Sequence, residues 1–186
     1  MEPLKGVNAG AQPTPPEAMG LAAFNALPGA RARAVLLTCC RSRRWAGEVS
    51  AGRPYPSLSV LLAKAGSALT DTDVSDALTG HPRIGQAPRG AHGTWSRLEQ
   101  AGMTGAARDE LAELAEGNQA YEARFGHIYL VCAAGRGAAE LLQVLRERLR
   151  NDPVTERAVV RDELRKINEI RLERLIGHEH SHDARA

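Results

Sequence analysis

The chain has 186 residues, of which 43% are hydrophobic and 25% charged, a composition typical of a globular domain. Its formal net charge of +2 is too small to indicate a nucleic-acid-binding surface. No apolar run approaches the ~20 residues that a membrane-spanning helix needs. We therefore expect no nucleic-acid partner and no membrane. Aromatic residues make up only 4%, so the core must be built mainly from Leu, Ala, Val and Ile.

The three cysteines, Cys39, Cys40 and Cys132, all lie in apolar runs, and two of them are adjacent. This pattern is typical of buried, reduced thiols, and we expect a cytoplasmic protein. The spacing does not match the Cys-x-x-Cys pairs of metal sites, so we expect no metal. Residues 1–16 include Lys5 but no apolar core, which does not indicate a secretory signal.

Pro and Gly divide the chain into a flexible lead-in at 1–19, a folded domain at 20–177 and a polar, disordered tail at 178–186. Within the domain, periodicity and caps predict a series of helices. The predicted helices cover residues 21–27, 30–40, 58–65, 70–78, 104–115, 118–125, 138–151 and 153–176. The helix at 30–40 continues or restarts at 42–46, and the helix at 58–65 is ended by Gly66. A further helix starts at Ser96.

The run His127 to Ala134 has strand propensity but no convincing partner strand, so we expect a short extended or helical core segment. The fold class predicted is therefore all-α, a single-domain bundle of about eight helices with no substantial sheet.

Two segments carry the residue types of a proton-transfer site. His81 begins the tight loop His81-Pro-Arg-Ile-Gly85, and Ser96, Glu99 and Gln100 share one face of a predicted helix start. An imidazole on a proline-stiffened loop and a carboxylate beside an amide can move and orient a proton. The plainer alternatives are a surface histidine and a capping-box glutamate.

Other polar residues are more ambiguous. Asn118 can cap the helix that it begins, and Tyr121 and Phe125 on the same face are more typical of packing than of a site. Arg171 lies among apolar residues of the last helix, where a guanidinium beside a pocket would bind a carboxylate or carbonyl in a forked way. The histidines of the tail are most simply solvated.

Six segments in the same order resemble the decarboxylases of 2-oxo-4-hydroxy-4-carboxy-5-ureidoimidazoline (OHCU), which act in urate degradation. The segments are Cys39-Cys-Arg-Ser-Arg-Arg-Trp-Ala46, Arg53-Pro-Tyr-Pro-Ser57, His81-Pro-Arg-Ile-Gly85, Ser96-x-x-Glu99-Gln100-x-Gly102, Asn118-x-x-Tyr121-x-x-x-Phe125-Gly126 and Ile170-Arg171-Leu172. Each is weak alone, but six in order are specific.

The resemblance implies an all-α lyase that needs no cofactor, is commonly a homodimer and converts OHCU to (S)-allantoin and CO2. It implies that His81 and Glu99 are catalytic. The substrate-binding residues that it implies are Pro82, Ser96, Gln100, Phe125, Gly126, His127, Ile128 and Arg171. Arg165 and Arg174 share the helix of Arg171 and remain alternatives to it. The chain departs from the expected pattern at His127, where an apolar or aromatic residue is expected, and at Gly137, where a hydroxyl is expected.

Two other functions stay open on the sequence. A non-catalytic all-α binding or adaptor module would use the His81 loop only as a turn. A metal-dependent hydrolase using His81, His92 and the tail histidines is less favoured. Convergence of His81, Glu99 and Gln100 on one pocket would distinguish the decarboxylase from the adaptor.

Overall fold

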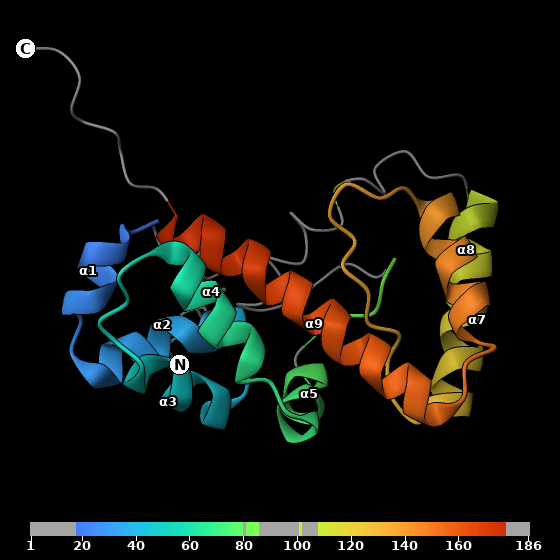
Figure 1. Ribbon diagram of the computed structural model, residues 1–186. Helices are drawn as coiled ribbons and strands as arrows, with labels where there is room; N and C mark the ends of the chain where they lie inside the picture. The colour runs from blue at the N-terminus through green and yellow to red at the C-terminus, as the bar shows by residue number, and fades with distance from the viewer. Residues whose placement is uncertain (1–17, 80, 86–100, 102–107, 178–186) are drawn as a thin grey trace, which may run out of the picture.

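The computed structural model describes residues 18–79, 81–85, 101 and 108–177, and all of the regular structure within them is helical (Figure 1). The helices are α1 (Leu21–Ala26), α2 (Gly29–Cys39), α3 (Arg43–Ala51), α4 (Leu58–Ser67), α5 (Asp71–Leu78), α7 (Arg108–Phe125), α8 (Ala138–Arg148) and α9 (Pro153–Ile176). The all-α prediction is confirmed. None of the described helices is long and apolar enough to cross a membrane. Residues 1–17 and 178–186 lie outside this part of the chain.

Two clusters of buried side chains form the core. The first cluster contains side chains from the helices α1 through α5 and from the long helix α9. It includes Phe24, Leu36, Trp45 and Leu164. The second joins α7 to α8 through residues such as Leu141. Figure 1 shows α9 running from the α7–α8 pair at its start to α1 at its end. The helix α9 thus begins beside the second cluster and contributes its buried side chains to the first.

The segment after α7 is extended and serves both clusters at once. Tyr129, Val131 and Ala133 are buried in the second cluster. The alternate residues, Leu130 and Cys132, are buried in the first. Successive side chains of an extended chain point in opposite directions, which explains the alternation. Of the two predicted forms, extended or helical, the structure has the extended one, and its strand-like composition reflects burial on both sides.

Helix boundaries follow local capping, with two corrections to the sequence analysis. Ser42 starts α3 as a separate helix, because its hydroxyl accepts a hydrogen bond from the Trp45 backbone N–H at 3.2 Å. The predicted end of α4 at Gly66 is wrong, since the helix continues to Ser67. The two helices predicted at 104–115 and 118–125 are in fact one, α7, which passes through Gly117.

Gly117 sits inside α7 for a packing reason. A Cβ atom at this position would lie 2.6 Å from Cδ2 of Leu145 in α8, which is closer than real contacts allow. Leu145 itself is fully buried. The missing side chain therefore lets α7 and α8 approach each other, which outweighs the low helix propensity of glycine.

Asp73 fixes the start of α5 to the start of α3. Its carboxylate accepts hydrogen bonds from the Thr70 backbone N–H at 2.8 Å, from the Ser42 hydroxyl and from Arg44 Nε at 3.0 Å. Burial alone would raise the pKa of Asp73, but the bonds from Arg44, Ser42 and Thr70 outweigh it and lower the pKa to about 2. Since α5 leads into the His81 loop, this cluster of bonds helps to position that loop.

The three cysteines are buried and none forms a disulfide, as the sequence analysis expected.

Candidate active site

His81 follows the last turn of α5 and folds back onto it. Its backbone N–H donates to the Leu78 carbonyl at 3.3 Å, and its ring Nδ1 lies 2.9 Å from the Ala77 carbonyl oxygen. A carbonyl can only accept, so Nδ1 carries the proton in this contact. The lone pair of the neutral ring is then on Nε2, and that atom is buried. The tautomer is thus set by the backbone of α5.

The loop after His81 is held by α7. The Nδ2 of Asn118 donates to the Ile84 carbonyl at 3.1 Å, and the Ile84 side chain is buried in the second cluster. The guanidinium of Arg83 makes a forked pair with the Glu122 carboxylate, through Nε to Oε1 and through Nη2 to Oε2 at 2.7 Å. This pair lowers the pKa of Glu122. Gly85 ends the loop with a φ of 82°, a conformation that favours glycine.

The end of α7 presents a group of rings. Gly126 stops the helix with a φ of 76° and lets the chain reverse toward the extended segment. The rings of Tyr121 and Phe125 have centroids 4.7 Å apart, and the His127 ring lies 5.5 Å from that of Tyr121. His127 also places its Nδ1 3.1 Å from the Ile128 carbonyl oxygen. The unexpected histidine is thus accommodated as an aromatic neighbour.

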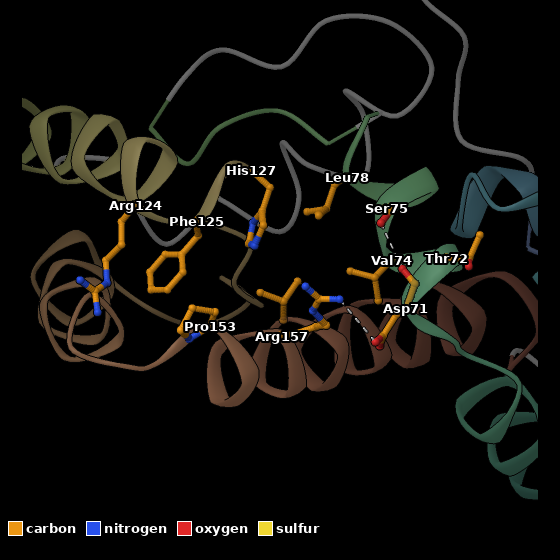
Figure 2. Close-up of a pocket in the computed structure, with 11 residues that line it drawn as sticks. Asp71, Thr72, Val74, Ser75, Leu78, Arg124, Phe125, His127, Pro153 and Arg157 are labelled. Atoms are coloured by element: carbon orange, nitrogen blue, oxygen red, sulfur yellow. Dashed lines mark hydrogen bonds and ion pairs between the residues drawn. The ribbon is translucent and has the colours of Figure 1, made fainter.

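A cavity of about 440 Å³ opens between α5, the end of α7 and the start of α9 (Figure 2). Phe125 and His127 lie on one side of it, and Leu78 and Asp71 of α5 lie on the other. Arg157 of α9 reaches across to Asp71, with a 4.0 Å separation between Nη1 and Oδ2. The cavity therefore combines aromatic surface with ionisable groups.

Only part of the predicted binding set faces this cavity. Phe125 and His127 line it, whereas the other described members of the set do not: His81, Pro82, Gly126, Ile128 and Arg171. Ser96, Glu99 and Gln100 lie outside the described residues, so the predicted pairing of His81 with Glu99 stays a prediction.

Arg171 is fully buried on α9, and its Nη1 donates to the Cys39 carbonyl at 2.8 Å, at the end of α2. Arg165, an alternative left open by the sequence, forms surface ion pairs with Asp162 and Glu169 of its own helix. Arg174 is half-buried. Of the three, Arg171 is the one enclosed in the protein interior.

The surroundings of Arg171 contain further polar groups. Cys40 lies within electrostatic reach of Arg171 and Asp73, and burial raises the pKa of its thiol. Asn168, one turn before Arg171, is 2% exposed, and neither atom of its amide makes a hydrogen bond of normal geometry in the described part of the chain. Sequence reasoning missed Asn168. The helical spacing could have indicated that Asn168 is buried, since it shares the helix face of Leu164, Arg171 and Leu172.

No group of three or more His, Cys, Asp or Glu side chains able to hold a metal is found among the described residues. The histidines of the tail are outside that part of the chain.

These residues and this fold place the chain in a known family. The sequence model of the OHCU decarboxylase family matches residues 25–173, and the chain belongs to this family. A crystal structure of OHCU decarboxylase determined in the presence of (S)-allantoin superposes with a TM-score of 0.67 at 29% identity, over 76% of this chain and 96% of that one. A structure of (S)-allantoin synthase superposes with a TM-score of 0.64 at 18% identity, over 85% of this chain and 54% of that one, and at this identity shows the fold alone.

Two sequence relatives carry related names. The chain is 34% identical, over 75% of its length, to the uric acid degradation bifunctional protein TTL of Arabidopsis thaliana, and spans 45% of that protein. It is 33% identical, over 70% of its length, to 2-oxo-4-hydroxy-4-carboxy-5-ureidoimidazoline decarboxylase of Amia calva, and spans 79% of it. The chain therefore spans less than half of the bifunctional relative and most of the single-function one.

Proposed function

We propose that the protein decarboxylates OHCU to (S)-allantoin and CO2, as a carboxy-lyase of urate degradation. The observation that carries the proposal is the match of residues 25–173 to the decarboxylase family. The similarity to nearly the whole of a solved OHCU decarboxylase supports it. The geometry at His81 adds a group suited to proton transfer.

The chemistry needs little more than positioning and a proton. The substrate carries a carboxylate and a hydroxyl on one carbon of a conjugated heterocycle. Breaking the bond to the carboxylate releases CO2, and the electron pair moves into the conjugated ring to give an enol. Delivery of one proton to one face of the neighbouring carbon, which carries the ureido group, completes the reaction as the enol hydroxyl loses its proton and becomes the carbonyl. The protein must therefore orient the carboxylate, stabilise the developing charge and supply the proton.

We assign His81 as the general acid and base. Its Nδ1–H is engaged by the Ala77 carbonyl, so Nε2 is the atom through which a proton would pass to or from the substrate. Glu99 would accept N–H bonds from the ring or ureido group and orient the substrate or the imidazole. Ser96 and Gln100 would hold the ureido end.

The remaining residues would complete the pocket. Pro82 and the segment from Phe125 through Gly126 and His127 to Ile128 would line the substrate. Arg171 would bind an oxygen-rich edge, and its burial supports this role, because a guanidinium withheld from water binds an anion more strongly. We propose further that the enzyme is a cytoplasmic homodimer that works without a cofactor.

The test is to add the purified protein to freshly generated product of urate oxidation and to follow circular dichroism. We expect optically active allantoin to form faster than in the spontaneous reaction, with the S form in excess. A folded protein that leaves the rate and the racemic outcome unchanged would overturn the proposal. Heat-denatured protein at the same concentration is the control.

A non-catalytic adaptor is less well supported. Its binding face should expose a continuous apolar surface. Within the described residues, the large apolar side chains that are exposed are Val60, Leu111 and Val154, which lie on three different helices.

A further inference from the structure

We infer that α7 positions the imidazole of His81 by clamping the loop that follows it, through Asn118 and Glu122. The inference rests on the proposed function, since it gives these two side chains a part in catalysis. Neither was assigned a role in the reaction by the sequence pattern. Both are positioning residues, because they act on the loop and not on the substrate.

The clamp has two contacts from one face of α7. Asn118 and Glu122 are four residues apart, so their side chains lie one above the other. Asn118 is 4% exposed and donates to the Ile84 carbonyl at 3.1 Å. The carboxylate of Glu122 accepts two hydrogen bonds from the Arg83 guanidinium in a forked ion pair. A forked pair fixes direction as well as distance. Two successive residues of the loop are therefore held in a defined orientation.

The other end of the loop is fixed to α5. The backbone of His81 bonds to Leu78, and its ring bonds to Ala77. Three residues, the distance from His81 to Ile84, span at most about 11 Å. The proline ring of Pro82 removes one of the free dihedral angles between the two anchors. A change at the Asn118 or Glu122 contact must therefore be absorbed at His81 and Pro82.

This arrangement also ties the imidazole to the packing of the two clusters. Ala77 belongs to the first cluster, whereas Ile84 and Tyr121 belong to the second. Among the described residues, the loop runs from the first cluster to the second. The direction of the His81 ring thus depends on where α7 lies relative to α5.

The contact that Asn118 makes is suited to holding the loop. Its Nδ2 bonds to a backbone carbonyl, that of Ile84, so the contact fixes the course of the chain itself. Its Oδ1 is buried and has no hydrogen-bond partner among the described residues. The side chain thus sets the geometry of the loop at Ile84.

The experiment compares Asn118→Leu, Glu122→Gln and the paired exchange Arg83→Glu with Glu122→Arg against the wild-type protein. Leucine keeps the branching and the number of heavy atoms of asparagine and removes the bond to Ile84. Glutamine keeps the shape of glutamate and removes its charge. The matched control is Glu116→Gln, the same change at an exposed position of α7.

Two readouts are needed. Allantoin formation gives kcat and KM, and NMR titration of the His81 ring gives its pKa without substrate. We expect kcat to fall about tenfold or more in Asn118→Leu and Glu122→Gln, with KM changed much less, because misplacing a catalytic group by a fraction of an ångström slows chemistry steeply. The His81 titration should shift in the same variants. The paired exchange should recover most of the activity lost in Arg83→Glu alone.

Folded Asn118→Leu and Glu122→Gln proteins with the wild-type kcat and the wild-type His81 titration would overturn the clamp. If Asn118→Leu fails to fold, Glu122→Gln and the paired exchange decide the matter. If the wild-type protein forms no allantoin, the proposed function fails. The NMR titration still tests the clamp in that case, since it needs no substrate.

Discussion

Arg148 at the end of α8 and Glu156 in the first turn of α9 form a buried ion pair, with Nη2 and Oε1 2.5 Å apart. Their side chains are 6% and 0% exposed. The same carboxylate accepts a hydrogen bond from the Tyr121 hydroxyl of α7, and Arg148 also donates to the Leu130 carbonyl at 2.6 Å. Burial alone would lower the pKa of Arg148, but the hydrogen bond that Arg148 donates to Glu156 raises it. This network joins the second cluster to α9.

The first prediction concerns this pair. Glu156→Ala should lower the free energy of unfolding by about 3–5 kcal/mol, because it leaves the Arg148 charge buried without its partner. Chemical denaturation measures the change. The double variant Glu156→Leu with Arg148→Met should be markedly more stable than Glu156→Ala, since it buries no charge. A Glu156→Ala protein as stable as the wild type would show that water reaches Arg148.

The second prediction concerns acid stability. The pKa of Asp73 is about 2 in the folded protein, below its unfolded value of 3.8. A lowered folded pKa stabilises the protein above the unfolded pKa, and this contribution is lost as the pH falls from about 4 to 2. Asp73→Asn should therefore be less stable by about 2 kcal/mol at neutral pH.

The check is to measure urea denaturation of both proteins across that range. The stability difference between the wild type and Asp73→Asn should shrink as the pH falls from 4 to 2. A difference that stays constant with pH would mean that the Asp73 charge contributes nothing.

The third prediction compares two glycines inside helices. Gly117→Ala should destabilise the protein by about 1–3 kcal/mol, because its Cβ would meet Leu145 at 2.6 Å. Gly47→Ala in α3 is the control, since a Cβ there meets nothing within 4 Å. It should stabilise the protein by about 0.5–1 kcal/mol through helix propensity. Thermal unfolding of both variants measures the two changes in stability. Equal changes at Gly117 and Gly47 would contradict the packing explanation.

The fourth prediction separates two arginines of α9. Arg165→Gln should leave kcat/KM for allantoin formation nearly unchanged, because Arg165 pairs with Asp162 and Glu169 on the surface. Arg171→Gln should lower it by an order of magnitude or more if Arg171 binds the substrate. Circular dichroism in the far ultraviolet confirms that each variant is folded. The reverse ranking would move the substrate-binding role to Arg165.

Much of the fold was predictable because its signals are local. Ser42, Ser57 and the Asp152-Pro153 pair are helix starts that the sequence marks by capping residue types. Gly117 led to the wrong prediction of a helix break, because the reason for a glycine there is close packing against Leu145, which is distant in sequence. The form of the segment from His127 to Ala134 was likewise undecided, since two-sided burial hides the alternation of an extended chain.

The sequence proposes the candidate site through its motifs, and the roles of its residues stay predictions. His81 and Arg171 stand out by residue type and position, and the resemblance implies their roles. The burial of Arg171 distinguishes it from its neighbours on α9. The roles of Asn118 and Glu122 could not be predicted, because they depend on which loop packs against which helix face. The spacing of Asn118, Tyr121 and Phe125 indicated a functional or packed face but not its partner.

The most direct test of the account is the rate of (S)-allantoin formation by folded His81→Ala protein with freshly generated OHCU. Replacing the imidazole removes the group that we assign to proton transfer, so we expect the rate to fall to nearly that of the spontaneous reaction. The helical circular dichroism and the unfolding temperature should stay close to those of the wild type. Turnover close to the wild-type rate in the folded variant would contradict the central role of His81.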